Sequence, residues 1–510
     1  MQYLLGIDIG TYASKGVLVA ETGDIVASKA VAHTLDIPRP GWAEHDAETI
    51  WWDDFVQITS DLIASSGLLS SQIAAVGFSA ISPAVLPIDG QGKPLRRAIL
   101  YGIDTRATRE VQDLQKIVDH DPEMSRLGIQ LSSQSATPKV EWIRRNEPGV
   151  WAITSRIVNG SGFLVHRLTG ENTIDVYDAS SFSPFLDLEQ GEWNQNSFRY
   201  IATQDILPRI TWTSEIAGRV TSHGARLSGL AEGTPIITGT ADAAAEAISA
   251  GLSAPGDLMV MYGSSIFFIQ RTPEMVRTRL FWSAPFLERG TYVLAGGMST
   301  SGSLTRWFRD EFAPLEVQAE KQGGANAYAA LAELAASAPP GANGLVMLPY
   351  FSGERTPILD PCAKGVIFGL GLSHTRADIY RALLESIGYG ILHNIELMKL
   401  EGATPRRILA IGGGALNSLW VQIVSDIANI EQNIPQQQVG ASYGDAFLAG
   451  IGIGLFSSTR QGSQWFKSAH IVKPDLETNN KYQAYYKIYR KLYTQNASLM
   501  KELSLLMLED

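Results

Sequence analysis

The chain has 510 residues, of which 45% are hydrophobic and 18% charged. This length and composition predict a globular protein with two sizeable domains, since single domains usually run to about 100–200 residues. The formal net charge of −11 argues against a nucleic-acid partner, because nucleic-acid binders usually present a basic surface. The single cysteine, Cys362, excludes an intramolecular disulfide and a cysteine metal cluster. We expect neither a signal peptide nor a membrane span, and therefore a cytoplasmic protein without a membrane partner.

The first part of the chain alternates short apolar runs with glycine-bearing turns. Apolar runs at 3–9, 16–20 and 25–31 predict three strands of a β-meander. A helical pattern follows over 48–64, and a short strand is predicted at 73–79. Strands and helices then alternate as far as the apolar run that begins at Pro235. This alternation predicts a mixed α/β fold.

The strand–glycine turn–strand opening returns about half the chain later. Runs at 257–262, 266–270 and 291–295 repeat the pattern, though not the sequence, of the opening. The repeat predicts two related domains, each presenting a glycine turn to one cleft. A helical run ends at Ser253-Ala-Pro-Gly, so we divide the chain into an N-terminal domain, residues 1–248, and a C-terminal domain, residues 249–510.

The tail from Asn480 has the pattern of an amphipathic helix. Five tyrosines recur there at mostly helical spacing: Tyr482, Tyr485, Tyr486, Tyr489 and Tyr493. We interpret them as core-packing residues rather than as ligand contacts.

The first candidate for chemistry is the segment that begins Gly6-Ile-Asp-Ile-Gly-Thr. Alternate residues of a strand share one face, so Asp8 lies between Gly6 and Gly10 on that face. A carboxylate between two glycines leaves room for a large anion and its metal, and Mg²⁺ prefers such oxygen ligands. Thr11 and nearby backbone N–H groups would then approach phosphate oxygens. The alternative is that Asp8 only begins a hairpin turn.

The second candidate is Asp242, which follows Thr238-Gly-Thr-Ala. The pattern predicts a strand, a turn and then a helix that begins at Asp242. An aspartate there is typical of an ordinary helix cap, which is the alternative to a catalytic role. The two roles are compatible, because a helix N-terminus favours the ionised carboxylate and a general base must be ionised to accept a proton.

Two further glycine turns suit phosphate or a flat ligand. The turn Gly263-Ser264-Ser265 permits close backbone approach and offers hydroxyls, although it could equally be a plain hairpin. The run Gly412-Gly-Gly-Ala415 follows a strand and precedes a helix. A dinucleotide fingerprint is the alternative there, with Glu431 near the spacing of a ribose-binding acid. We rank it second, because Asn417 occupies the place of its third glycine.

Together these segments resemble the FGGY carbohydrate kinases, and xylulokinases most closely, over nearly the whole chain. The matching segments are Gly6–Thr11, Gly41–Asp46, Ala98–Tyr101, Asp104–Arg106, Gly239–Asp242, Leu348–Pro357, Gly369–Arg376 and Ile411–Ala415. The resemblance implies an α/β fold with two actin-like ATPase (ribonuclease H-like) domains flanking a deep cleft. It implies that sugar binds mainly to the N-terminal domain and ATP mainly to the C-terminal one.

The resemblance also implies roles for individual residues. Asp242 falls on the family's catalytic base and Asp8 on its magnesium-associated carboxylate. The nucleotide- and phosphate-binding positions are Thr11, Gly263, Ser264, Ser265, Gly302, Gly413, Gly414 and Ala415, with Asn417 and Ser418 near adenine. The sugar-binding positions are Ile81, Ser82, Pro83, Tyr101 and Asp104, together with Asp242.

Two positions depart from the pattern of xylulokinases. Pro83 stands where their Gln-Met-His-Gly segment has histidine, and Tyr101 stands where tryptophan is usual. Proline has no side-chain donor, so one sugar contact is lost or replaced. We expect ATP- and Mg²⁺-dependent phosphorylation of a sugar hydroxyl, on a pentulose such as xylulose. The alternatives are a glycerol-, ribulose- or gluconate-like substrate, or a non-kinase actin-like ATPase, and a homodimer is left open.

Overall fold

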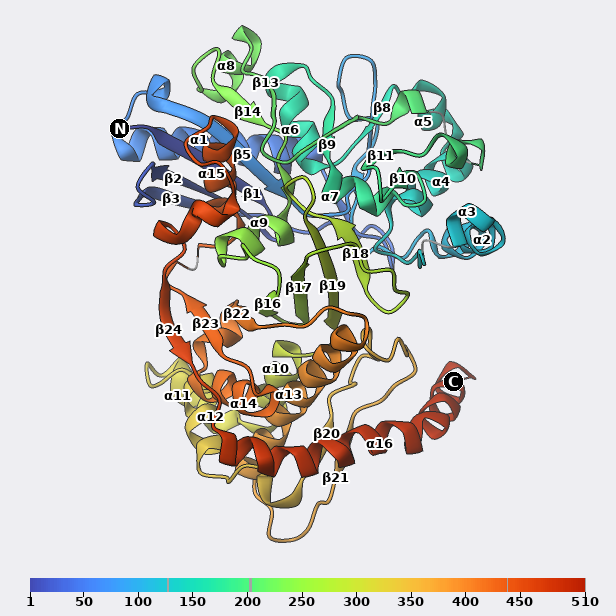
Figure 1. The fold of residues 1–510 in the computed structure, drawn as a ribbon, viewed down its shortest axis with the longest axis vertical. Helices are drawn as coiled ribbons and strands as arrows, with labels where there is room; N and C mark the ends of the chain where they lie inside the picture. Colours follow the sequence, from blue (N-terminus) through green and yellow to red (C-terminus); the bar gives the residue numbers. More distant parts are fainter. Residues whose placement is uncertain (126–127, 201–203, 438, 510) are drawn as a thin grey trace.

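The computed structural model describes residues 1–510 except 126–127, 201–203, 438 and 510. The described chain forms two lobes, each built around a seven-stranded sheet (Figure 1). We call the lobe that contains the N-terminus the first lobe and the other the second lobe. Among the described residues, no helix combines the length and the apolar character needed to cross a bilayer.

The sheet of the first lobe has the order β13-β14-β5-β1-β2-β3, with β15 also paired to β5. Its strands are β1 (Tyr3–Ile9), β2 (Ala13–Ala20), β3 (Ile25–Ala32), β5 (Ile73–Ala80), β13 (Ile216–Arg219), β14 (Pro235–Ile237) and β15 (Thr240–Ala241). The strands β1, β2 and β3 form an antiparallel meander, and β1 runs parallel to β5. The predicted meander is confirmed.

The sheet of the second lobe has the order β18-β19-β17-β16-β22-β23-β24. Its strands are β16 (Asp257–Tyr262), β17 (Ile266–Thr272), β18 (Trp282–Pro285), β19 (Tyr292–Met298), β22 (Arg407–Ile411), β23 (Gln432–Pro435) and β24 (Ser468–Val472). Here β16, β17 and β19 form the antiparallel meander, and β16 runs parallel to β22. The predicted repeat of pattern is therefore a repeat of sheet topology.

Helices and small ribbons cover both sheets. The helices are α1 (Asp53–Ser66), α2 (Thr108–His120), α3 (Pro122–Ser125), α4 (Ala136–Asn146), α5 (Pro148–Ile153), α6 (Gly160–Thr169), α7 (Val176–Ala179), α8 (Ser222–Ser228), α9 (Asp242–Ser249), α10 (Gly302–Phe312), α11 (Pro314–Lys321), α12 (Ala327–Ala336), α13 (Arg376–Leu400), α14 (Ser418–Ala428), α15 (Ala441–Gly452) and α16 (Leu476–Glu509). The ribbons pair β4 (Glu44–His45) with β7 (Ala98–Ile99), β6 (Leu86–Ile88) with β8 (Arg156–Val158), β9 (Thr173–Asp175) with β12 (Arg209–Thr211), β10 (Leu186–Asp187) with β11 (Glu192–Trp193), and β20 (Val346–Leu348) with β21 (Val366–Phe368).

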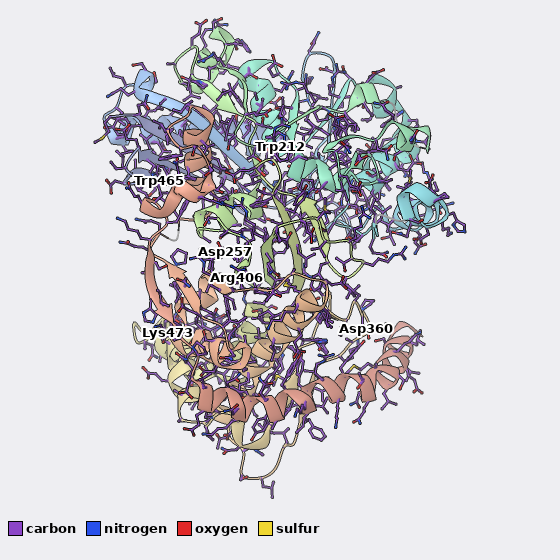
Figure 2. All side chains as sticks on the ribbon, viewed as in Figure 1. Trp212, Asp257, Asp360, Arg406, Trp465 and Lys473 are labelled. Carbon is purple, nitrogen blue, oxygen red and sulfur yellow. The ribbon has the colours of Figure 1, made fainter. Side chains whose placement is uncertain are left out.

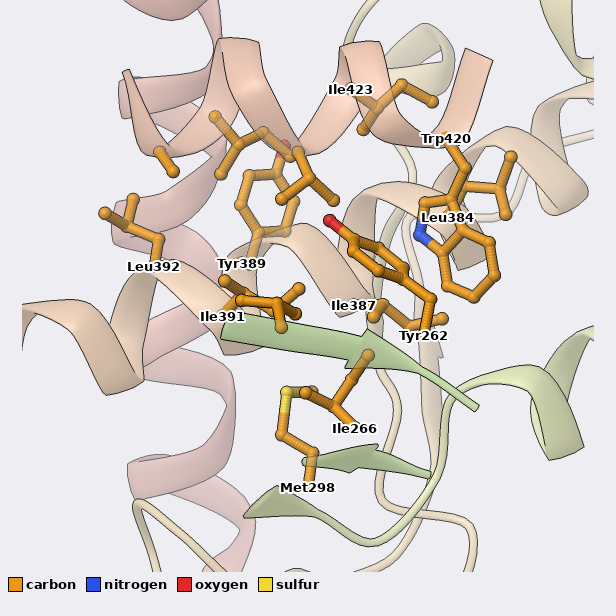
Figure 3. Close-up of a cluster of buried hydrophobic side chains, with 14 of the residues drawn as sticks. Tyr262, Ile266, Met298, Leu384, Ile387, Tyr389, Ile391, Leu392, Trp420 and Ile423 are labelled. Atoms are coloured by element: carbon orange, nitrogen blue, oxygen red, sulfur yellow. The ribbon is translucent and has the colours of Figure 1, made fainter. Parts of the chain in front are cut away.

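The core of the second lobe packs aromatic side chains between its sheet and its helices (Figure 3). Tyr262 of β16 meets Trp420 of α14 edge-on, with ring centres 5.4 Å apart. Three tyrosines of α16 surround Tyr389 of α13: Tyr482, Tyr486 and Tyr489. All three are buried, so the predicted packing role of the tyrosines in the tail is confirmed for these positions.

Helix α15 comes from the last quarter of the sequence but packs on the sheet of the first lobe, where Figure 1 shows it in red among blue elements. At two glycines of this sheet the contact brings backbone against backbone. A Cβ atom on Gly6 of β1 would lie 1.9 Å from the carbonyl oxygen of Ser442. A Cβ atom on Gly77 of β5 would lie 2.2 Å from that of Asp445. The interpretation of Gly6 as room for an anion was wrong, because α15 fills this space.

The segment after α15 also returns to the first lobe. The indole N–H of Trp465 donates to the Glu21 carbonyl at 3.3 Å. Close by, the hydroxyl of Tyr443, within α15 itself, donates to the Gly23 carbonyl at 2.8 Å. Figure 2 shows Trp465 at the edge of the first lobe. The predicted boundary at residue 248 divides the sequence but not the lobes completely. Helix α15 and Trp465 come after this boundary and still contact the first lobe.

We predict that Gly6→Ala destabilises the protein by about 1–3 kcal/mol, the usual range for overpacking a rigid contact. The added methyl would overlap the backbone of α15, which cannot move without losing its contacts with the sheet. Chemical denaturation of the purified protein measures the change.

The matched control is Gly149→Ala in α5, where a Cβ atom would meet nothing within 4 Å. This variant should be as stable as the wild type. Equal stability of Gly6→Ala and Gly149→Ala would contradict the backbone contact.

Candidate active site

The register of the first sheet brings together residues that lie far apart in sequence. Asp8 of β1 pairs with Ser79 of the parallel strand β5. On the other side of β5, Thr240 of β15 pairs with the same serine. Asp242 follows two residues later as the first residue of α9. Strands β1 and β15 therefore flank β5 on its two sides, which brings Asp8 and the start of α9 to the same region of the sheet.

The predicted helix beginning at Asp242 is confirmed, but this residue is not the cap. Ala241 occupies the N-cap position. The Asp242 carboxylate oxygen Oδ1 accepts the N–H of Ala243 at 2.7 Å. The second oxygen, Oδ2, makes no hydrogen bond to the described residues and is available to a ligand.

The carboxylates of this region raise one another's pKa values. Burial raises the pKa of Asp8 to about 6, against the opposing effect of Lys15. Burial and then the charge of Asp8 raise the pKa of Asp242 well above its usual range. One helical turn after Asp242, burial and Asp8 raise the pKa of Glu246 to about 7. These three acidic groups therefore repel one another, and a bound cation would relieve that repulsion.

A fourth carboxyl group, Asp445 of α15, connects with Asp8 through Ser79. The Ser79 hydroxyl lies 2.7 Å from Asp445 Oδ2 and 3.3 Å from Asp8 Oδ1. Asp445 is fully buried, and its Oδ1 has no hydrogen-bond partner among the described residues. Sequence reasoning missed Asp445, because its helix lies more than 430 residues after β1 and nothing local places it there.

The acidic groups suit Mg²⁺ carried by a nucleotide. No three His, Cys, Asp or Glu side chains of the described part of the chain are grouped to hold a metal ion directly. Mg²⁺ typically keeps several waters and binds one or two carboxylates together with substrate phosphates. Asp8 fits this pattern, because its carboxylate makes only the long contact with Ser79 and lies near the acidic groups on α9.

On the second lobe, two predicted nucleotide-binding segments meet. The N–H of Gly302, the first residue of α10, donates to the carbonyl of Gly263 at 2.9 Å. The N–H of Ser303 donates to the carbonyl of Ser264 at 2.9 Å. A Cβ atom on Gly302 would lie 2.6 Å from the Gly263 oxygen, so glycine is required for this approach.

The third predicted nucleotide-binding segment lies against the same strand. Gly412 adopts φ +86°, and a Cβ atom there would lie 2.9 Å from the carbonyl of Tyr262, the last residue of β16. A Cβ atom on Gly413 would meet nothing within 4 Å, so this turn is open to a ligand. Asn417 caps α14, its Oδ1 accepting the N–H of Trp420 at 3.1 Å. A contact of Asn417 or Ser418 with adenine stays a prediction.

The predicted sugar-binding residues divide into two groups. The Tyr101 hydroxyl lies 3.3 Å from Thr11 Oγ1, and burial followed by the charge of Asp242 raises the pKa of Tyr101. Tyr101 thus lies within the electrostatic reach of the proposed base. Asp104, in contrast, accepts the Ala43 N–H at 2.7 Å and the guanidinium of Arg106. Its visible role is to anchor its own loop.

Ser82 lies beside a buried acidic residue, Asp178, that sequence reasoning missed. Its hydroxyl donates to Asp178 of α7, whose pKa burial raises to about 6. The neighbouring Tyr177 is buried, and its hydroxyl makes no hydrogen bond to a described residue. Its ring meets Trp282 of the second lobe edge-on at 4.8 Å. Tyr177 therefore spans the two lobes near the base, because Asp242 contributes to its raised pKa.

Comparison with known proteins agrees with this geometry. The models of the N-terminal and C-terminal domains of the FGGY family of carbohydrate kinases match residues 3–249 and 258–453. The chain therefore belongs to the FGGY family of carbohydrate kinases, as its sequence motifs indicated. The two-domain α/β fold is likewise confirmed. The alternative interpretation of the Gly412 turn as a dinucleotide fingerprint does not agree with this fold.

The chain is similar in full length to several kinases of this family. It is 28% identical to a xylulose kinase of Bacillus subtilis, with 98% of each chain covered. It is 26% identical to a gluconokinase of Bacillus licheniformis, over 98% of this chain and 99% of the relative. The crystal structure of xylulose kinase from Rhodospirillum rubrum superposes with a TM-score of 0.90 at 30% identity, covering 98% of this chain and all of that one.

We predict that Glu246→Gln raises the thermal unfolding midpoint of the metal-free protein at pH 8 by roughly 2–4 °C. The native Glu246 holds its proton up to about pH 7, whereas the unfolded chain releases it near the ordinary value of 4.5. The native state therefore loses stability as the pH rises from about 4.5 to 7, and glutamine removes this loss.

Thermal unfolding in a chelator at pH 4 and pH 8 measures the effect, which should vanish at pH 4. The exposed Glu232 gives the control variant, Glu232→Gln. An identical midpoint of Glu246→Gln and wild type at pH 8 would contradict the raised pKa of Glu246.

Proposed function

We propose that this protein transfers the γ-phosphate of ATP to a hydroxyl group of a small sugar, with Asp242 as the general base. The observation that carries the proposal is the strand register that places Asp8 and Asp242 on either side of Ser79. We propose a pentulose such as xylulose as the substrate, in view of the similar xylulose kinases. A gluconate-like substrate is the second candidate, because full-length gluconokinases are similar as well.

In this proposal the chain's own residues orient the acceptor and take its proton. ATP supplies the phosphoryl group, and Mg²⁺ on its phosphates offsets the negative charge around Asp8. With that charge offset, Asp242 ionises and accepts the hydroxyl proton at Oδ2, since Oδ1 is held by the N–H of Ala243. As the proton moves to Asp242, the sugar oxygen attacks the γ-phosphorus in line, the bond from that phosphorus to the oxygen of ADP breaks, and ADP leaves. Most of the catalysis is positioning and charge stabilisation.

The acceptor pocket in this proposal lies between Tyr101, Ser82 and Tyr177. Tyr101 and Ser82 offer hydroxyls that already contact Thr11 and Asp178. The Tyr177 hydroxyl offers a donor to a sugar oxygen without breaking an existing bond. This set of hydroxyls replaces the histidine contact that Pro83 lacks. We place the reaction in the cytoplasm, where ATP is supplied, and leave the oligomeric state open.

We predict that Asp242→Asn lowers kcat by about 10²–10⁴-fold, the usual contribution of a general base. Asparagine retains the oxygen that accepts the Ala243 N–H but cannot take the proton. A coupled assay of ADP release across xylulose, ribulose, gluconate and glycerol identifies the substrate and measures the loss. Calorimetry should show nearly unchanged ATP affinity.

The control for this experiment is Asp104→Asn, which alters a buried acidic residue of the same lobe that binds its own loop. It should change stability more than kcat. Near-normal sugar phosphorylation by Asp242→Asn would overturn the assignment of the base, and sugar-independent ATPase activity of the wild type would overturn the kinase itself.

We further predict that Tyr101→Phe raises KM for the sugar about threefold to tenfold, as expected for the loss of one hydrogen bond. Its KM for ATP should not change, because we assign the Tyr101 hydroxyl to the sugar and not to the nucleotide. Initial-rate measurements with each substrate varied in turn test this split. Tyr328→Phe, in α12 of the second lobe, is the control and should leave both constants unchanged.

A further inference from the structure

Two buried histidines lie beneath the turn that joins β1 to β2. The Nε2 atom of His33 lies 3.1 Å from the carbonyl oxygen of Gly10. The Nε2 atom of His45 lies 3.1 Å from the carbonyl oxygen of Thr11. Their rings meet edge-on with centres 5.1 Å apart. Two successive carbonyls of the turn are therefore each held by an imidazole.

The hydrogen-bond partners fix the proton on His45. Its Nδ1 faces the indole N–H of Trp51 at 3.2 Å, and an indole nitrogen can only donate. Nδ1 therefore accepts, and the ring proton is on Nε2, where it is donated to Thr11. Burial, with His33 as a further cause, lowers the pKa of His45 to about 4, so the ring stays neutral at physiological pH.

His33 has a different set of partners. Its Nδ1 lies 2.8 Å from the carboxylate of Asp54, while its Nε2 faces the Gly10 carbonyl. Both partners are acceptors, so only the doubly protonated ring donates in both directions. Asp54 is anchored in turn by the hydroxyl of Ser14 at 2.6 Å. The side chains of His33 and Asp54 are buried, being 7% and 8% exposed.

The orientation of the carbonyls determines where the N–H groups of the turn point. In a trans peptide the C=O and the N–H point in opposite directions. With the Gly10 and Thr11 carbonyls directed at the histidines, the N–H groups of Thr11 and Tyr12 are directed away from them. Neither N–H makes a hydrogen bond to a described residue. Two adjacent free backbone donors are an established way of binding a phosphate oxygen.

We propose that His33 and His45 are positioning residues for phosphoryl transfer, holding the Thr11 and Tyr12 N–H groups toward the transferring phosphate. The inference rests on the proposed kinase function and adds residues that touch neither substrate. The donors act where negative charge builds up on the phosphoryl oxygens during transfer, which is where preorganised hydrogen bonds contribute most.

The test compares variants that keep or remove the donor of His45. In His45→Gln, the amide can accept the Trp51 N–H and donate to the Thr11 carbonyl as the imidazole does. We expect kcat within about threefold of wild type. In His45→Leu the donor is lost, and we expect kcat to fall about 10–100-fold, less than the 10²–10³-fold for removing a direct donor. KM for the sugar should not change.

Glutamine at position 33 should have the opposite effect to glutamine at position 45. Glutamine offers one donor and one acceptor, whereas this site has two acceptors. His33→Gln should therefore lose kcat much as His45→Leu does. A glutamine that rescues one histidine and not the other is a result that a merely structural role would not give.

A binding measurement separates positioning from a general loss of structure. Calorimetry measures the affinity of each variant for ADP–Mg²⁺ alone and for ADP–Mg²⁺ with fluoroaluminate, a mimic of the transferring phosphoryl group. His45→Leu and His33→Gln should weaken only the second affinity, by about tenfold or more. The control, His393→Leu, alters a buried histidine of α13 in the second lobe and should change neither.

Equal weakening of both affinities, or unchanged fluoroaluminate binding with normal kcat, would overturn the inference. A wild type that phosphorylates no sugar would overturn the proposed function instead. If His45→Leu does not fold, Trp51→Phe takes its place. It removes the donor that fixes the His45 proton, and we expect a severalfold lower kcat. An unchanged kcat of Trp51→Phe would likewise contradict the inference.

Discussion

The backbone contact between α15 and the first lobe determines where the acidic groups lie. Glycines allow three elements to approach the helix closely: Gly6 of β1, Gly77 of β5, and Gly444 of α15 itself, which faces α9. A Cβ atom on Gly444 would lie 2.1 Å from the carbonyl of Ala245 on α9. Each of these three elements carries one polar residue of the site: Asp8, Ser79 and Asp242. Because protein interiors are rigid and close-packed, the helix holds the three in a fixed relation. The catalytic geometry thus depends on a helix that carries none of the predicted residues.

Electrostatic repulsion is the second constraint on this site. Asp8, Asp242, Glu246 and Asp445 are acidic groups whose pKa values burial raises, and the charge of Asp8 raises the pKa values of the other three. Such an arrangement is unfavourable for the empty protein and favourable once a cation is present. A cation bound near these acidic groups would therefore lower the pKa values that their mutual repulsion raises. The histidines under the Gly10–Thr11 turn act differently, because they hold two backbone carbonyls of that turn.

Much of the fold was predictable from local pattern, because strands, glycine turns and helix starts leave short-range signals. The runs at 3–9 and 257–262 coincide with β1 and β16, and the helix beginning at Asp242 is observed. The sequence could not assign the space beside Gly6, since its occupant lies more than 430 residues away. Asp445, Tyr177 and the two histidines were missed for the same reason. Their partners are set by tertiary contacts, and a lone histidine or aspartate carries no signal of them.

The return of α15 to the first lobe has a consequence for synthesis of the chain. The last strand of that sheet ends at residue 241. The helix that covers the surface around Gly6 and Gly77 spans residues 441–452 and is synthesised much later. A ribosome must therefore add about two hundred further residues before that surface is buried, which takes about 10–40 s at typical rates of 5–20 residues per second. During that interval the nascent first lobe exposes backbone beside its central strands, and it reaches its final form only after α15 has been synthesised.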